Sequence, residues 1–404
     1  MSAVAEKARF YLEQAVPQLR EFESKGIFTA DEIRNLVRKR TEYEHLVLSP
    51  GNKAQDWLNY VAWERSLEAL RAKRCRRLEI KASTSHVGEG RVFGILERAV
   101  NRHPGSLELW RAYLDFARRT RATKRYRKVM TRALRLHPGK PELWVMAGQR
   151  FARSGDMVSA RTFFMRGARF CVRVPTVWLE YARCEMEWLE KMEARKGKKG
   201  GAAKAIQEQA EHDDDEIRFE ESDRDDDGDD ADGSGRIIVP NPDRTAGAKN
   251  VFDAETTDKL KNNPALDGAI PLAIFDISKK QPFFCPAAAE QFFDLFAVFS
   301  QVSVQRRILQ HVLDTMNELY PNDAATLFCY IRQPLVGLDP NSPEYPKALR
   351  DTLGRIKSSL VTTTNKKLLS TKLRSWLESL LASDDMDAGI RTVIQHTVKT
   401  LPPP

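Results

Sequence analysis

Three tryptophans, Trp110, Trp144 and Trp178, recur at intervals of 34 residues, and this spacing constrains the fold more than any other feature of the sequence. Tyr113 and Tyr181 each stand three residues after one of these tryptophans. Residues three and seven apart lie on one stripe of an α-helix, so each tryptophan marks a helix with an aromatic face. A fixed period of this length is typical of arrays of stacked helix pairs.

A further copy of the pattern precedes these three. It begins at Trp57 with Tyr60 three residues later, and the interval to Trp110 is 53 residues, 19 longer than the period. Extra sequence is therefore inserted in this copy. Seven residues after the tryptophan, the first and last copies have Glu64 and Glu185.

A second helix is expected in each of three units, with a small residue at its centre. Pro104 and Pro138 follow the first two of these helices, again 34 residues apart. Proline cannot continue a helix without losing a hydrogen bond, and a central alanine lets the neighbouring helix approach closely. Since one pair buries only part of its apolar face, the sequence predicts an all-α fold, an α-solenoid of stacked pairs. The predicted repeat core is Trp57, Tyr60, Trp110, Tyr113, Trp144, Trp178, Tyr181, Ala99, Ala133 and Ala168.

Charge is distributed unevenly along the chain. Residues 1–192 contain 38 Lys and Arg against 22 Asp and Glu, a formal charge of +16, although the whole chain carries only +9. Residues 211–232 contain 14 acidic residues and two arginines, a charge of −12. Such a segment repels itself and has little apolar surface to bury. We therefore expect an N-terminal helical segment (1–54), a repeat solenoid (55–192), a disordered charged linker (193–250) and a C-terminal helical region with degenerate repeats (251–404).

The region after the linker carries the pattern in weaker form. Phe292, Leu295 and Phe299 stand where the tryptophan, tyrosine and glutamate of a unit would be, and the following helix is expected to end at Pro321. Near the other end of the chain, Thr29 and Glu32 have the spacing of a capping box that opens a helix, after Gly26 closes the preceding one. An amphipathic helix is expected around residues 373–381.

The Trp-x-x-Tyr-x-x-x-Glu helix, followed by an Arg-Ala helix that ends in proline, resembles the half-a-tetratricopeptide (HAT) repeat, which is nearly confined to RNA-processing proteins. The N-terminal region narrows the resemblance. It is similar to the family of the sixth Utp protein, the small-nucleolar-RNA-associated proteins of the small-subunit processome. The matching segments are FYLEQAVP (10–17), GIFTADEI (26–33), RKRTEYEH (38–45), WLNY (57–60) and RCRRL (74–78).

This resemblance implies a non-catalytic scaffold of ribosome biogenesis that acts in 18S pre-rRNA processing. It implies a nucleolar, and hence nuclear, subunit of the UtpB complex that works as an obligate member of a large assembly. The implied partners are other UtpB subunits, including tandem β-propeller proteins, together with pre-rRNA and the small nucleolar ribonucleoprotein, contacted directly or through partners.

The sequence shows no sign of enzymatic chemistry. It has no phosphate-binding glycine loop, no His-Glu-x-x-His and no Gly-x-Ser-x-Gly pattern, and its five cysteines form no Cys-x-x-Cys pair. We expect no cofactor and no metal. His103 and His137, each before a proline, are expected to be repeat-end residues. No apolar run approaches the length of a membrane span, and the first residues lack a signal peptide, so we expect a soluble intracellular protein.

Two basic clusters are candidate contact sites, and two interpretations of them remain open. They could bind RNA phosphates, or they could form a solvated face or a face for acidic partner proteins, and the sequence favours the second. Aromatic side chains that could stack on bases belong mostly to the repeat core, apart from Tyr126. The candidates are Arg71, Lys73, Arg74, Arg76 and Arg77 in the first cluster, and Arg118, Arg119, Arg121, Lys124, Arg125, Arg127 and Lys128 in the second.

The acidic segment has three interpretations. It is a solubilising spacer, a shield that competes with RNA for the basic half, or a phosphorylation segment, with Ser222 between acidic neighbours as the candidate phosphosite. Two alternative functions also stay open for the chain: a HAT scaffold of pre-mRNA splicing or 3′-end processing, and a direct RNA-binding protein that uses the basic clusters. The N-terminal segments argue against the first alternative, since those families lack them.

Overall fold

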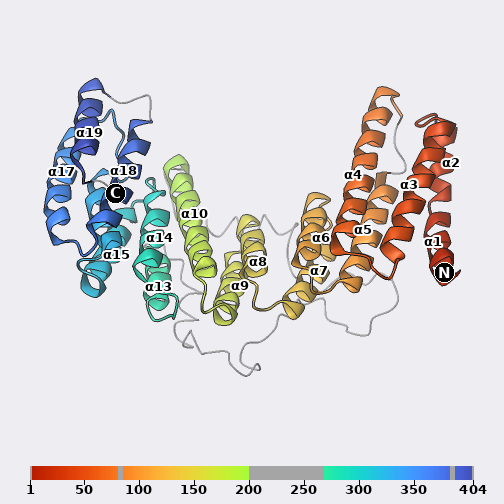
Figure 1. Cartoon of the computed structure of the whole chain (residues 1–404), viewed down its shortest axis with the longest axis horizontal. Helices are drawn as coiled ribbons and strands as arrows, with labels where there is room; N and C mark the ends of the chain where they lie inside the picture. Colours follow the sequence, from red (N-terminus) through yellow and green to blue (C-terminus); the bar gives the residue numbers. More distant parts are fainter. Residues whose placement is uncertain (1, 81–84, 200–267, 383–386, 403–404) are drawn as a thin grey trace. The chain divides into compact units, whose positions relative to one another are not determined.

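The computed structural model describes residues 2–80, 85–199, 268–382 and 387–402, and all regular secondary structure in these ranges is helical. The all-α prediction is confirmed for this part of the chain. The helices form two compact units, one reaching to His137 and one starting at Pro138, and within each unit helices that are close in the chain pack against one another, most of them as direct neighbours (Figure 1). In the residues described, no helix is both long enough and apolar enough to cross a membrane.

The first unit contains seven described helices. α4 packs on α5, α5 on α6 and α6 on α7, while α1 packs on α3. The helices are α1 (Ser2–Glu13), α2 (Val16–Ser24), α3 (Ala30–Leu48), α4 (Ala54–Arg77), α5 (Ser85–Arg102), α6 (Leu107–Arg119) and α7 (Thr123–Leu136).

The junction between α2 and α3 follows the local sequence signals. The Thr29 hydroxyl accepts a hydrogen bond from the Glu32 amide, and the Glu32 carboxylate accepts one from the Thr29 amide at 2.9 Å, so the predicted capping box is confirmed. Gly26 has φ +63°. This left-handed conformation, which glycine adopts without strain, ends α2 as predicted and lets the Ile27 amide donate to the Phe22 carbonyl at 2.9 Å.

The predicted core side chains lie inside the units. All ten are 2% exposed or less. Buried indole N–H groups need acceptors, and the repeat supplies them from its own turns: Trp110 Nε1 donates to the Pro104 carbonyl at 2.8 Å, and Trp144 Nε1 donates to the Pro138 carbonyl at 2.7 Å. His137 Nε2 lies 2.7 Å from that same Pro104 carbonyl oxygen. The His-Pro turns therefore anchor the tryptophan helices.

The second unit contains ten described α-helices and one 3₁₀ turn. α10 packs on α8, α9, α13 and α14, and α16 packs on α14, α17 and α18. The elements are α8 (Pro141–Arg153), α9 (Met157–Phe170), α10 (Thr176–Lys199), α13 (Ala269–Ser278), α14 (Pro286–Ala297), α15 (Gln305–Leu319), α16 (Ala324–Arg332), the 3₁₀ turn Gln333–Leu335, α17 (Tyr345–Thr362), α18 (Lys366–Leu381) and α19 (Ala388–Thr400).

α8 and α9 approach each other closely because glycines face their contact. A Cβ atom built on Gly167 would lie 2.7 Å from the Cβ of Trp144, and one on Gly148 would lie 2.5 Å from Cε2 of Phe164. Both distances are too short for a side chain to fit without moving its neighbours. The small residue that the sequence placed at Ala168 is therefore accompanied by a still smaller one beside it.

The segment predicted as a linker begins within α10. This helix continues to Lys199, so residues 193–199 are helical. Lysine, arginine and glutamate are good helix formers, and the sequence analysis considered only their charge. Residues 200–250, with the acidic run and Ser222, lie outside the described part of the chain.

The helices after the linker belong to the same unit as α10. The rings of Trp178 and Phe283 lie 6.2 Å apart, and the Ser303 amide donates to the Glu193 carboxylate at 2.9 Å. The residues placed in a degenerate repeat, Phe292, Leu295 and Phe299, are buried, and α15 ends at Leu319, two residues before Pro321. Farther along, Leu373 and Leu377 of α18 are fully buried in a cluster with Ile394 of α19.

Candidate functional site

A buried polar cluster joins α3 and α4 in the first unit. Arg40 Nε and Nη2 donate to the two carboxylate oxygens of Glu64 at 2.8 and 3.0 Å. The two side chains are only 2% and 3% exposed. A charge that is removed from water needs this kind of two-bond pairing, because an uncompensated charge in a core is very costly.

A second carboxylate, Glu44, extends the cluster to α5. It accepts a hydrogen bond from the Tyr60 hydroxyl at 2.9 Å and two from the Arg98 guanidinium at 2.8 and 2.9 Å. Burial, with the nearby Glu44 and Glu64 carboxylates, raises the pKa of Tyr60 far above its usual value, so this hydroxyl stays a donor. The cluster thus fixes three consecutive helices relative to one another.

The Arg–Glu pair recurs in the second unit. Arg161 donates to Glu185 at 2.8 and 3.0 Å with both side chains buried. The partners are 24 residues apart, as Arg40 and Glu64 are, and each arginine stands 17 residues before the tryptophan of its repeat. The sequence analysis identified the glutamates but missed these arginines, although that shared spacing was the signal that could have found them.

The copy of the repeat that begins at Trp110 replaces this ion pair by apolar residues. It has Phe93 at the arginine position and Ala117 at the glutamate position. Both are buried, and the Phe93 ring packs 4.7 Å from that of Phe116. The same place in the fold therefore accepts either a salt bridge or a hydrocarbon contact, so the pair has a structural role.

Two arginines of the first basic cluster already have partners within the structure. Arg71 is 3% exposed, and its guanidinium donates to Glu68 at 2.9 Å and to Cys75 Sγ at 3.5 Å. Arg74 donates to the Glu32 carboxylate at 2.6 and 2.7 Å and to the Ile27 carbonyl at 3.0 Å. Arg71 is paired within α4 itself, whereas Arg74 has long-range partners that the sequence did not reveal.

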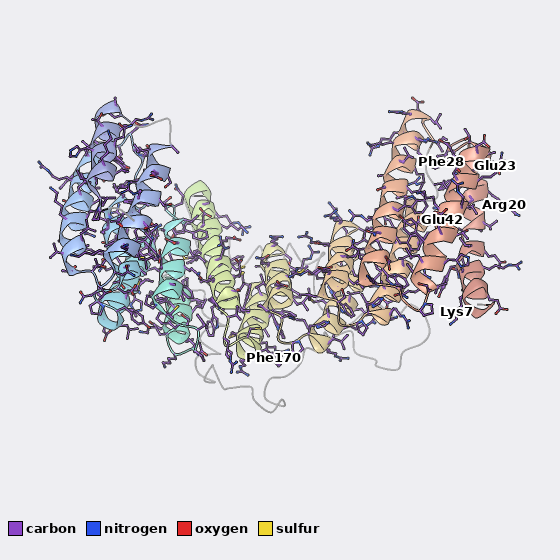
Figure 2. The ribbon with its side chains drawn as sticks, in the orientation of Figure 1. Lys7, Arg20, Glu23, Phe28, Glu42 and Phe170 are labelled. Atoms are coloured by element: carbon purple, nitrogen blue, oxygen red, sulfur yellow. The ribbon has the colours of Figure 1, made fainter. Side chains whose placement is uncertain are left out.

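The Arg74 guanidinium also lies over the ring of Phe28, 4.6 Å from its centroid. Phe28 is labelled in Figure 2. The other three cations of the first cluster, Lys73, Arg76 and Arg77, are exposed. They share the surface with two exposed leucines, Leu70 at 42% and Leu78 at 52%. Residues 70, 73 and 77 lie on one stripe of α4. This face is mixed, apolar and basic.

The ion pair between Glu32 and Arg74 makes stability depend on pH. Hydrogen bonds from Arg74 and from the Thr29 amide lower the pKa of Glu32 from 4.5 to about 2. A depressed carboxyl pKa contributes stability that is fully present above the unfolded value and is lost as the pH falls towards the folded one. Glu32→Gln, which keeps the cap, should cost about 0.5–1 kcal/mol near neutral pH because the half-exposed pair is screened by solvent.

Glu32→Ala removes the cap as well and should cost about 1–2 kcal/mol. Urea unfolding gives the free energy of unfolding of the parent and of both variants. The measurement is repeated as the pH is lowered from 4.5. The difference between the parent and Glu32→Gln should shrink towards acid pH. A difference that stays constant would show that the charge of Glu32 contributes nothing.

The second basic cluster surrounds the turn between α6 and α7. Arg118, Arg119, Arg121, Lys124, Arg125 and Lys128 are exposed. Arg127 differs, because it is half-buried and burial lowers its pKa. Tyr126 is 8% exposed, so it belongs to the core and offers no ring to a base.

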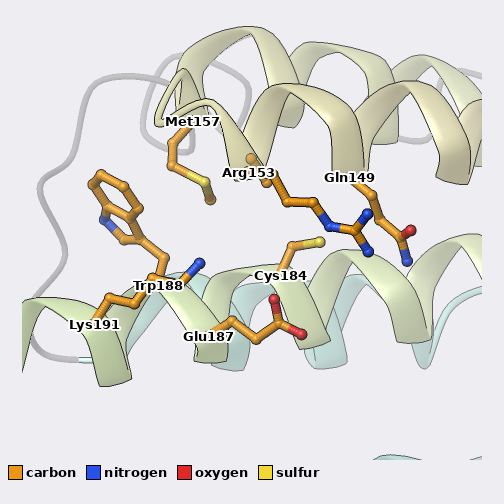
Figure 3. A pocket seen from close by; sticks show the side chains of 8 residues that line it. Gln149, Arg153, Met157, Cys184, Glu187, Trp188 and Lys191 are labelled. Atoms are coloured by element: carbon orange, nitrogen blue, oxygen red, sulfur yellow. The ribbon is translucent and has the colours of Figure 1, made fainter. Parts of the chain in front are cut away.

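A small pocket between α8 and α10 also contains chemically reactive groups (Figure 3). Gln149 and Arg153 reach from α8 towards Cys184 and Glu187 of α10, while Met157 faces Trp188. Burial raises the pKa of the Cys184 thiol to about 12, so it is not a nucleophile at neutral pH. Across the described ranges no group of His, Cys, Asp or Glu is arranged to hold a metal ion.

The sequence of this chain is similar to those of known proteins. Residues 12–103 match the sequence model of the family described as U3 small nucleolar RNA-associated protein 6. The chain is 34% identical over 196 residues to the Schizosaccharomyces pombe protein of that name. It is 30% identical over 201 residues to the human homolog. Residues 12–103 are thus similar in sequence to this family.

The aligned segments cover 48% of this chain, but only 40% of the S. pombe protein and 33% of the human one. The chain therefore spans less than half the length of these members of the U3 small nucleolar RNA-associated protein 6 family. The family segment 12–103 contains the whole polar cluster of Arg40, Glu44, Tyr60, Glu64 and Arg98. The basic turn between α6 and α7 lies after it.

Proposed function

We propose that this chain is a non-catalytic HAT-repeat scaffold of ribosome biogenesis, a subunit of the UtpB part of the small-subunit processome that acts in 18S pre-rRNA processing in the nucleolus. The observation that carries the proposal is that the family segment 12–103 coincides with a set of helices locked by buried ion pairs. The relatives are named as U3 small nucleolar RNA-associated proteins. The tryptophan repeat that follows supplies stacked helices with extended surface.

Scaffolding is the activity that these features support. The buried charges are neutralised by one another, and the thiol at the pocket of Figure 3 is protonated at neutral pH. A stack of helix pairs fixes partners relative to one another without a reaction centre. We expect those partners to include other UtpB subunits, among them tandem β-propeller proteins, and the small nucleolar ribonucleoprotein with pre-rRNA.

Purification of the tagged full chain from cells, with mass spectrometry and RNA sequencing of what is recovered, tests the proposal. U3 small nucleolar RNA, pre-rRNA and processome proteins should be recovered together, and the tagged chain should locate to the nucleolus. Recovery of splicing or 3′-end-processing factors without processome proteins would replace this function by the alternative HAT scaffold.

Within this function, the exposed α4 face is assigned to a protein partner. It combines Leu70 and Leu78 with Lys73, Arg76 and Arg77, and apolar anchors next to cations fit an acidic protein surface with apolar side chains. Leu70→Asp with Leu78→Asp should reduce recovery of one protein partner at least tenfold and leave the fold intact. Val158→Asp, at an equally exposed position of α9 (55%), is the matched control and should leave recovery unchanged.

A further inference from the structure

The turn between α6 and α7 carries the densest positive charge of the described repeats. Residues 118–128 contain seven Lys and Arg and no Asp or Glu. The equivalent residues one repeat later, 152–162, contain two Arg and one Asp. The repeat pattern itself therefore does not require cations here.

Most of these cations project into solvent. Arg119, Arg121 and Lys128 are exposed, and the pair of Arg118 with Asp115 at 2.9 Å is itself 45% and 43% exposed. Arg125 is exposed, and its guanidinium lies over the Phe93 ring, 4.5 Å from the centroid. Residues 118–128 contain no acidic residue of their own, so the turn has a high density of positive charge.

The surroundings of the turn distinguish between a protein and a nucleic acid as its partner. Protein interfaces need apolar or aromatic anchors at their centre. Between Val87 and Leu136, all of it described, no large hydrophobic side chain is exposed. This differs from the α4 face, where two leucines accompany the cations.

The same surface also lacks a platform for unpaired bases. Single-stranded nucleic acids are held largely by stacking on aromatic rings, but Tyr126, Phe93 and Phe116 are each 8% exposed or less. Double-stranded RNA is recognised mainly through its shape, phosphates and 2′-hydroxyl groups. Arginine-rich surfaces with no rings and no apolar anchors fit that kind of ligand.

We propose that the α6–α7 corner, defined as Arg118, Arg119, Arg121, Lys124, Arg125 and Lys128, binds the phosphate backbone of double-stranded RNA without regard to sequence. The inference deepens the proposed function by giving an RNA-processing scaffold a direct RNA contact of stated chemistry, and it rests on that function only for the RNA's biological source. Phosphate contacts position an RNA but do not specify its sequence.

The local backbone provides a variant that separates binding from folding. Arg121 adopts φ +55°, a strained value for a residue with a side chain, whereas the equivalent residue one repeat later is Gly155 at φ +90°. Ala122 gives α7 no side-chain cap, whereas the equivalent Asp156 accepts from the Ser159 amide at 2.9 Å. Arg121→Gly with Ala122→Asp copies the relaxed, capped turn and changes the charge by −2.

Binding of the full chain to a fluorescent RNA hairpin of about 20 base pairs, and to a single strand of equal length, is measured by anisotropy over a range of salt concentrations. The parent should bind the duplex at least as tightly as the single strand, with strong salt dependence. Arg121→Gly/Ala122→Asp should weaken duplex binding about tenfold and lower the salt slope by about 1–2. Its thermal midpoint should rise, so the loss is not unfolding.

Lys73→Gln/Arg77→Gln, with the same charge change on the α4 face, is the matched control and should stay within twofold of the parent. Equal weakening by both variants would overturn the proposal, since it would then reflect net charge alone. A clear preference for the single strand would also overturn it. So would binding of an acidic polypeptide more tightly than the duplex, if Arg121→Gly/Ala122→Asp abolishes that binding. If the chain does not bind RNA but processome proteins are still recovered with it, this inference is wrong and the proposed function stands. If the chain binds duplex RNA but no processome proteins are recovered, the inference stands and the proposed function is wrong.

Discussion

Replacing Glu64 by alanine should destabilise the first unit by about 3–5 kcal/mol, because it leaves the charge of Arg40 inside the core without its carboxylate. Both Arg40 side-chain bonds to Glu64 would be lost, and Arg40 is 1% exposed, so water cannot replace them. Arg91, whose pKa is lowered by burial and by the neighbouring Arg40, adds a second positive charge nearby. Urea unfolding of the parent and variant measures the cost.

The chain itself offers the matched control. Arg40→Phe with Glu64→Ala copies the arrangement of Phe93 and Ala117 in the next repeat. Well-packed apolar residues often replace a buried ion pair at little cost, so the double variant should recover to within about 1–2 kcal/mol of the parent. If the double variant is as unstable as Glu64→Ala, the pair contributes more than mutual neutralisation. If Glu64→Ala leaves the free energy of unfolding unchanged, the Arg40 side chain is not held in the core as the structure shows.

The local and periodic features of this fold could be predicted from the sequence. The pairs Trp110–Tyr113 and Trp178–Tyr181 indicate buried helix faces because the helical period brings residues three apart to one stripe. The capping box of Thr29 and Glu32 could be predicted because it involves two residues only three positions apart in the chain. Both signals lie within a single element and need no knowledge of what packs against it.

Contacts between elements could not be predicted in the same way. Arg74 stands among the same basic neighbours as Arg76 and Arg77, yet it is Arg74 that donates to the Glu32 carboxylate and the Ile27 carbonyl. Which arginine is committed depends on the packing of α2 and α3 against α4, and a list of charges does not contain that. Glu193 of α10 likewise bonds to Ser303, 110 residues away in the chain, a contact that the sequence does not reveal.

Replacing Trp144 by alanine should destabilise the second unit by about 3–5 kcal/mol. Its side chain is fully buried, donates to the Pro138 carbonyl at 2.7 Å and stacks on Phe170 with ring centroids 5.6 Å apart. Gly167 packs tightly against it, since a Cβ there would lie 2.7 Å from the Trp144 Cβ. The glycine has no side chain that could move into the cavity. Urea unfolding followed by near-ultraviolet circular dichroism gives the loss.

Trp144→Phe keeps a ring in the cavity but removes the bond to the Pro138 carbonyl, so it should cost less, about 1–2 kcal/mol. It keeps the comparison measurable if the alanine variant is too unstable to fold. Because α10 packs on both α8 and α13, the loss should also speed amide hydrogen exchange in α13 and α14. Exchange that accelerates in α8 and α9 alone would mean that the helices after the linker fold independently of the repeat before it, contrary to the contacts of Trp178 and Glu193.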